Sequence, residues 1–231
     1  MVMKRINVIL LSSFIALTVS AQKSVTRFLG IPVDGFKNEM KQKLIAKGFE
    51  YNSYSDDFSG EFNGVEVYLS IVTNNNKVWR ITVVDKVELN ETDIKIRFNK
   101  LWSQFMRNET YLPAGGEDFS IPQDEDISYN ILVNKKRYEA CFYQLDKTKD
   151  DIKEEITQKL LEKYTLEEIN NPPKKKEKEI SDFATIEGAK VASEAMDLNK
   201  SVWFMINEKY GKYRIVMYYD NEYNHSDGED L

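Results

Sequence analysis

Apolar residues in the first ninety positions follow two different periods. In segment 33–49, Phe36, Met40 and Leu44 recur every four residues with lysines between them, which predicts an amphipathic helix. In segments 65–71 and 79–83 every second residue is apolar, which predicts antiparallel strands with one buried face. Asn63-Gly64 is a strong signal for a two-residue hairpin turn, and segment 49–62 is expected to add two short strands.

The same order of helix and then hairpin is predicted twice more. A helix is expected in segment 91–108, whose apolar stripe is Ile94, Phe98, Leu101, Trp102 and Phe105. A loop follows, and then a hairpin with strands at 127–133 and 138–142. The third unit begins with a helix at 150–164. Its proline- and lysine-rich segment 170–182 is expected to be a mobile surface insertion. A short helix is expected in 184–198, and the last hairpin has strands at 202–206 and 213–217.

These patterns predict an α+β fold made of three degenerate repeats. Each repeat has one helix and an antiparallel hairpin or meander, and the strands form one antiparallel sheet with the helices on one face. A lone hairpin is marginal in water, so joining the strands gives each unit a shared core. The expected units are 22–89, 90–147 and 148–231, the last with the charged insertion 170–182 and a polar C-terminal tail. The alternative is a meandering α+β chain without a true repeat.

The first 21 residues have the layout of a secretory signal peptide. Lys4 and Arg5 precede an apolar run over 6–19, and Val19-Ser20-Ala21 fits a cleavage site after Ala21. The alternative is an N-terminal membrane anchor, although the run is shorter than the ~20 residues that a span needs. We therefore expect an exported protein of the periplasm or cell surface, with no transmembrane segment in the mature chain.

Charge excludes one class of partner. Removing Lys4 and Arg5 from 32 basic residues leaves 30, against 38 acidic residues, so the mature net charge is 30 − 38 = −8. Non-specific nucleic-acid binding needs a basic surface, so no nucleic-acid partner is expected.

Catalytic motifs are absent from the sequence. The only histidine, His225, lies in the polar tail, and the only cysteine, Cys141, lies in a predicted strand, where a structural thiol is favoured over a nucleophile. The acidic clusters 124–126 and 227–230 lack the alternating spacing of a calcium loop. We therefore expect a non-enzymatic protein with no catalytic residues, metal or cofactor. The alternative is a carboxylate-dependent envelope hydrolase, because any two acids can meet in space.

The face of the sheet opposite the helices carries the candidate binding residues. They are the outward positions of the alternation: Tyr68, Arg80, Tyr143, Trp203, Arg214 and Tyr218. Tyr, Trp and Arg dominate binding hot spots, and an exposed aromatic patch marks an interaction site. This predicts an exported protein that holds an envelope protein or glycan on an open sheet face. The alternative is a second core covered by a loop, the insertion or the tail. Truncating Arg80 or Arg214 to Ala should change stability by about ±0.5 kcal/mol, as surface substitutions do.

The order of helix and then meander over about residues 31–220 resembles the β-lactamase-inhibitor-like and outer-membrane small-lipoprotein-like group of exported proteins. Those inhibitors grip a partner with an open sheet face, so the resemblance implies partner binding. This chain departs from them because it has no disulfides and three predicted units, so inhibition of a β-lactamase is not implied. A calcium-regulated periplasmic domain of the peptidase-propeptide type is a second architectural relative. The segments "FLGIPVDGFKNEMKQKLIAKGF" and "YGKYRIVMYYDNEYN" are similar to uncharacterised exported proteins of anaerobic gut bacteria, which supports export and implies no activity.

Overall fold

The computed structural model of the 231-residue chain describes residues 24–115 and 118–225. The predicted signal peptide, residues 1–21, lies outside the described residues. Among the described residues, no helix combines the length and apolar character needed to cross a membrane.

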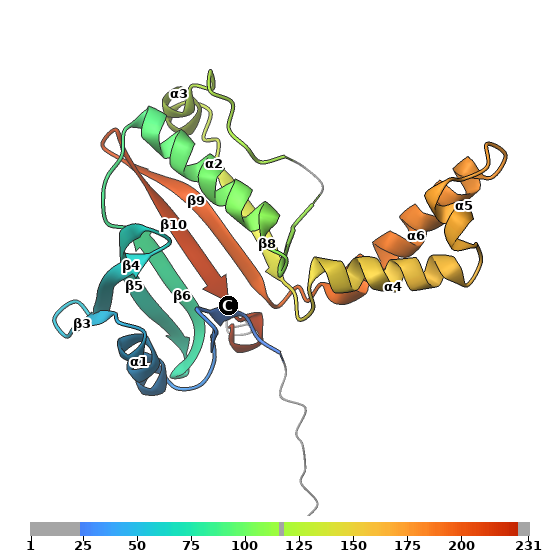
Figure 1. Cartoon of the computed structure of the whole chain (residues 1–231). Coiled ribbons are helices and arrows are strands. Elements are labelled where there is room, and N and C mark those ends of the chain that lie inside the picture. Colours follow the sequence, from blue (N-terminus) through green and yellow to red (C-terminus); the bar gives the residue numbers. More distant parts are fainter. Residues whose placement is uncertain (1–23, 116–117, 226–231) are drawn as a thin grey trace, which may run out of the picture.

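An eight-stranded antiparallel sheet is the centre of the fold (Figure 1). Its strands, in spatial order, are β3 (Glu50–Asn52), β4 (Asp57–Phe62), β5 (Val65–Asn74), β6 (Lys77–Asp85), β10 (Lys212–Asp220), β9 (Ser201–Lys209), β8 (Glu139–Gln144) and β7 (Tyr111–Pro113). A separate two-stranded sheet pairs β1 (Arg27–Phe28) with β2 (Ile31–Pro32). The predicted α+β class with an antiparallel sheet is confirmed.

Two helix-plus-meander halves build the large sheet. Helix α1 (Lys37–Ala46) precedes β3–β6, and helix α2 (Glu91–Arg107) precedes β7–β10. The halves join where β6 pairs with β10, so the strand order of the second half mirrors that of the first. Helix α1 packs on β3, β5 and β6, and α2 packs on β7, β9 and β10. The order of helix and then meander therefore occurs twice in the sheet, and the segment expected as the third unit supplies β9 and β10 to the second half.

The core lies between α1, α2 and the sheet, as the apolar patterns predict. All five residues of the predicted α2 stripe are buried, and the Phe105 ring stacks 4.7 Å from Phe142. The inward residues of β9 and β10 are buried against it: Val202, Phe204, Ile206, Tyr213, Ile215 and Met217. The predicted turn at Asn63-Gly64 is also confirmed, with positive φ angles of 54° and 74° between the paired residues Phe62 and Val65.

The predicted strand at 127–133 is wrong. Residues Ile127–Leu132 form the short helix α3, and the Asp126 side chain caps it by accepting a hydrogen bond from the Tyr129 N–H. Strand β8 pairs instead with β7 and β9. The second half therefore has no hairpin of its own at this position.

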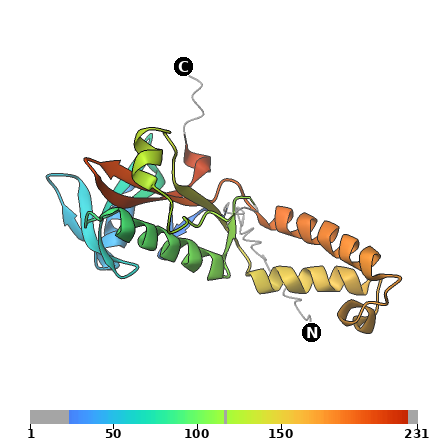
Figure 2. The same cartoon turned by 90° about the horizontal axis from the view of Figure 1, so that it is seen from above.

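The third predicted helix does not cover the sheet. Helices α4 (Lys149–Leu161), α5 (Leu166–Asn170) and α6 (Glu177–Ala195) form an arm that leaves the sheet between β8 and β9 and projects sideways (Figures 1 and 2). Small apolar clusters hold α4 against α6, one of them made by Leu160, Tyr164 and Ile180. The expected mobile insertion 170–182 is also wrong in part, because residues 177–182 are the first turns of α6. Glu179 there forms an ion pair with Lys163 and accepts a hydrogen bond from the Tyr164 hydroxyl, at 3.0 Å each.

Candidate functional site: the outer sheet face

The outer sheet face is the side opposite α1 and α2. On β10, Tyr218 pairs with Thr82 of β6 and with Trp203 of β9, and Trp203 pairs with Cys141 of β8. Directly paired residues of neighbouring strands point to the same face, so these side chains form a row across the central strands. In the adjacent row Arg80 pairs with Asp220. The strand register therefore brings residues from four separate segments of the chain together.

Four side chains on this face form a stack, which we call the aromatic–arginine ladder: Trp79, Arg80, Tyr218 and Trp203. The Trp203 and Tyr218 rings are stacked, with centroids 4.1 Å apart and planes 25° apart. The Arg80 guanidinium carbon lies 4.6 Å from the Tyr218 centroid and 4.2 Å from the Trp79 centroid. These distances are within the range of cation–π attraction.

The buried side chain of Asp220 holds two residues of the ladder, Arg80 and Trp203, in place. That side chain is 2 % exposed and accepts two hydrogen bonds from Arg80, at 2.6 and 2.7 Å. It also accepts one from the Trp203 indole N–H at 2.9 Å. A bidentate pair and a third donor leave Arg80 and Trp203 little rotational freedom. Sequence reasoning missed Asp220 because its partner Arg80 is 140 residues away, which no local pattern reveals.

A hollow of about 580 Å³ lies beside the ladder. Trp203, Tyr143 and Cys141 line it, with Arg137 and Glu139 also on its wall. Burial, and to a lesser extent the nearby carboxylates of Asp220 and Glu139, raise the pKa of the Cys141 thiol to about 11. The thiol is therefore neutral at ordinary pH, which fits the predicted structural role better than that of a nucleophile.

The six predicted binding residues do not form one cluster. Arg80, Trp203 and Tyr218 are in contact, and Tyr143 lines the same hollow as Trp203. Tyr68 lies apart, paired with Val84 of β6 and next to Lys86, and Arg214 lies apart, bound to Glu88 at 2.9 Å. All six side chains are exposed or half-buried in the described structure, so none of them belongs to a second buried core.

Trp79 is the one ladder residue whose direction the alternation predicts wrongly. A β-bulge between β5 and β6 places Val78 inward and leaves Trp79 on the outer side, half-buried. The Trp79 ring lies 4.5 Å from the ring of His225, centroid to centroid. Because a bulge inserts one unpaired residue, it shifts the alternation by one position, and the sequence gives no sign of it.

Among residues 24–115 and 118–225, no group of three or more His, Cys, Asp or Glu side chains is placed to hold a metal ion.

Comparison of the chain with protein-family models, curated proteins and solved structures found no match.

Proposed function

We propose that the chain is an exported, non-enzymatic binding protein that holds an envelope protein or glycan on its outer sheet face. The observation that carries this proposal is the aromatic–arginine ladder, which lies on the face without α1 and α2 and is fixed by a buried carboxylate. Export rests on the signal-peptide pattern of residues 1–21, and the ladder does not bear on it.

Pre-organisation is the physical reason that the ladder suits binding. Ordering a side chain at an interface costs about 0.5–1.5 kcal/mol, and Arg80 and Trp203 are already held by Asp220 before any partner arrives. The charge of Arg80 is balanced by Asp220, so a partner needs no opposite charge. The aromatic rings of the ladder, together with the hollow next to Trp203, offer a partner both apolar contact and hydrogen bonding.

The hydrolase alternative gains no support from the hollow. Catalysis by a carboxylate pair requires an acid that can donate a proton and a second acid that remains free. Three carboxylates line this hollow. Glu139 is bound to Arg137 at 2.8 Å, and both oxygens of Asp220 accept hydrogen bonds from Arg80. Glu222 lies 3.7 Å from His225, so it is the one acid of the three without an arginine partner, and a single such acid is not a pair. No observation in this hollow favours such a pair.

Capture from envelope extract tests the proposal. The mature chain is immobilised, and saturable retention is compared between wild type, Tyr218→Ala and the matched control Tyr54→Ala. Tyr54 is fully exposed, between β3 and β4, away from the ladder. We expect Tyr218→Ala to weaken retention by more than ~1 kcal/mol, about fivefold, and Tyr54→Ala to leave it unchanged.

Two treatments of the extract identify the partner class. Protease abolishes retention of a protein, and periodate abolishes retention of a glycan. Equal retention by Tyr218→Ala and wild type at matched thermal stability would overturn the proposal, as would the absence of any saturable component.

A further inference from the structure

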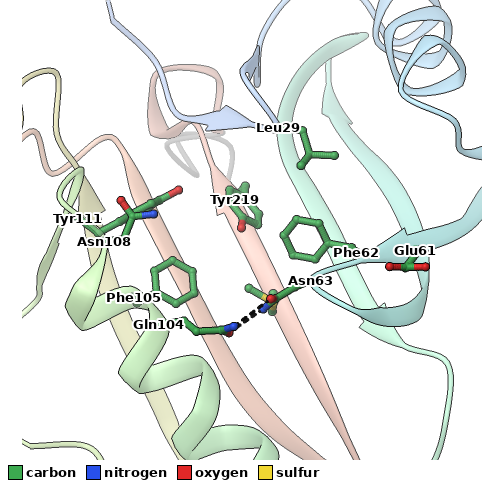
Figure 3. Close-up of a pocket in the computed structure, with 10 residues that line it drawn as sticks. Leu29, Glu61, Phe62, Asn63, Gln104, Phe105, Asn108, Tyr111 and Tyr219 are labelled. Carbon is green, nitrogen blue, oxygen red and sulfur yellow. Dashed lines mark hydrogen bonds between the residues drawn. The ribbon is translucent and has the colours of Figure 1, made fainter.

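A second candidate site lies on the opposite, helix-bearing side of the sheet. Two hollows, of about 450 and 580 Å³, share Leu29, Phe62, Asn108, Tyr111 and Tyr219, so they form one continuous cleft. Figure 3 shows its walls, with Leu29 and Phe62 on one side of Tyr219 and Asn108 and Tyr111 on the other. Small-molecule sites have volumes of this order.

The two halves of the fold meet across this cleft. Asn63, in the turn between β4 and β5, exchanges two hydrogen bonds with Gln104 of α2, at 2.9 and 3.2 Å (Figure 3). These amides form one end of the cleft. The site therefore exists only where the first half, the second half and the N-terminal β1–β2 hairpin come together.

Tyr219 is the feature that points to a ligand. The residue is only 5 % exposed, and its ring packs 5.0 Å from Phe28 and 6.4 Å from Phe62. Within residues 24–115 and 118–225 its hydroxyl makes no hydrogen bond, whereas the neighbouring Tyr111 hydroxyl accepts one from Gln144 at 2.8 Å. The hydroxyl borders the open cleft, so a bound molecule that displaces water from it and supplies a hydrogen-bond partner gains that interaction. Burial raises the pKa of Tyr219 well above its usual value, so the hydroxyl stays protonated and can donate or accept.

Leu29 supports the same interpretation. It lies in the two-residue turn between β1 and β2 with φ +50°, a left-handed conformation that Asn or Gly would adopt at lower cost. The turn itself does not require an apolar side chain, yet this leucine lines both hollows. We take it as an apolar wall held over the cleft.

We propose that this cleft binds a small uncharged molecule with a flat apolar body and one hydrogen-bonding atom placed at the Tyr219 hydroxyl. The flat body follows from the aromatic walls, Phe62, Phe105 and Tyr111. The lack of charge follows from the lining. The hollow next to α2 has one charged wall residue, the exposed Glu61. In the other hollow the Lys200 ammonium is bound to Asp146 at 2.6 Å, and the exposed Arg27 donates a hydrogen bond to the Gly30 carbonyl at 3.2 Å, so the walls present no buried, unpaired charge to a ligand. This site is independent of the proposed partner surface, because it lies on the other side of the sheet.

Neighbouring residues of β10 provide a matched pair of variants. Tyr218 and Tyr219 differ by one position and therefore point to opposite faces. Tyr219→Phe removes the hydroxyl in the cleft, and Tyr218→Phe removes one on the outer face. Leu29→Asn removes the apolar wall and places a residue that the left-handed turn favours.

Fluorescence titration of the mature chain with N-phenyl-1-naphthylamine tests the site. This probe is neutral, has flat rings and carries one N–H that can donate to the Tyr219 oxygen. We expect saturable enhancement with one site per chain. Tyr219→Phe should weaken binding by about two- to tenfold, Leu29→Asn by about fivefold or more, and Tyr218→Phe should have no effect.

Thermal stability provides the second measurement. Because the Tyr219 hydroxyl has no partner in the described structure, Tyr219→Phe should keep or raise the Tm. A fall of several degrees would show that the hydroxyl is bonded within the chain and would overturn the inference. Absence of saturable binding would also overturn it, as would equal effects of Tyr218→Phe and Tyr219→Phe on the probe.

Discussion

Replacing Arg80 and Arg214 by Ala should give very different losses of stability, although both residues lie on the outer sheet face. The Arg80 side chain is 22 % exposed and bound to Asp220, which is 2 % exposed. Arg80→Ala leaves that buried carboxylate with only the Trp203 indole as a side-chain donor. Breaking a buried pair from one side costs ~3–5 kcal/mol, and the residual exposure of Arg80 favours the lower end, about 3 kcal/mol. The sequence-based value near ±0.5 kcal/mol is therefore revised for Arg80.

Arg214 is paired with Glu88, whose side chain is 47 % exposed, and exposed pairs contribute about 0–1 kcal/mol. The Nε atom of Arg214 is also buried without a hydrogen-bond partner among the described residues, so removing the side chain relieves that cost. Arg214→Ala should therefore cost less than about 1 kcal/mol.

Urea denaturation measures both effects, and an unchanged m-value confirms that the comparison concerns stability alone. The two variants should differ by about 2 kcal/mol or more. The double variant Arg80→Ala/Asp220→Asn should be more stable than the sum of the single losses predicts, because no unpaired charge remains. Equal midpoints for Arg80→Ala and Arg214→Ala, or additive losses in the double variant, would refute the claim that Asp220 anchors the ladder.

Three further predictions follow from burial and charge. Ile81→Ala and Ile215→Ala should each cost ~2–5 kcal/mol in denaturant midpoints, since both side chains are fully buried, and a surface-like cost would contradict their inward direction. Burial opposes ionisation of Asp146, but the hydrogen bonds from Lys200 and Ser24 and the positive charges of Lys200 and Arg27 together outweigh it and lower the pKa of Asp146 below its usual value. The stability from the pair with Lys200 is present above the usual pKa and is lost as pH falls through the lowered pKa. The protection of backbone amides against hydrogen exchange at the base of the helical arm should therefore fall as pH drops through the lowered pKa of Asp146. Protection that does not change with pH would refute this prediction. With a pKa of about 11, Cys141 is about one thousandth ionised at pH 8, so Ellman's reagent should modify it far more slowly than in the unfolded chain, with a rate that rises toward pH 11.

Local sequence patterns were sufficient to predict those elements whose structure depends mainly on their own residues. Asn63-Gly64 specifies its turn through positive φ angles, and the five-residue apolar stripe of α2 specifies both the helix and the face that it buries. The strand prediction for segment 127–133 was wrong because its pattern is ambiguous. Ile127, Tyr129 and Ile131 alternate as in a strand, but Ile127 and Ile131 also have the spacing of one helix face. The cap at Asp126 decides for the helix, and that residue was a usable signal.

The features that the sequence did not predict depend on contacts between distant segments of the chain. A bulge at Trp79 depends on how β5 pairs with β6, and the Arg80–Asp220 pair depends on β6 meeting β10. The sequence predicts the helix at 150–164, but whether α4 packs on the sheet or on α6 depends on tertiary geometry. The cleft around Tyr219 forms from both halves, so no segment alone contains its signature.

Fluorine NMR of the chain labelled with 5-fluorotryptophan tests the proposed binding face most directly. The protein has three tryptophans: Trp79 and Trp203 in the ladder, and Trp102 in the core as an internal reference. Each resonance is assigned by a single Trp→Phe variant, and unlabelled envelope extract adds no fluorine signal. At extract concentrations that saturate capture, the Trp79 and Trp203 resonances should shift or broaden while Trp102 stays unchanged. Unchanged Trp79 and Trp203 resonances under saturating capture would contradict binding through the outer sheet face.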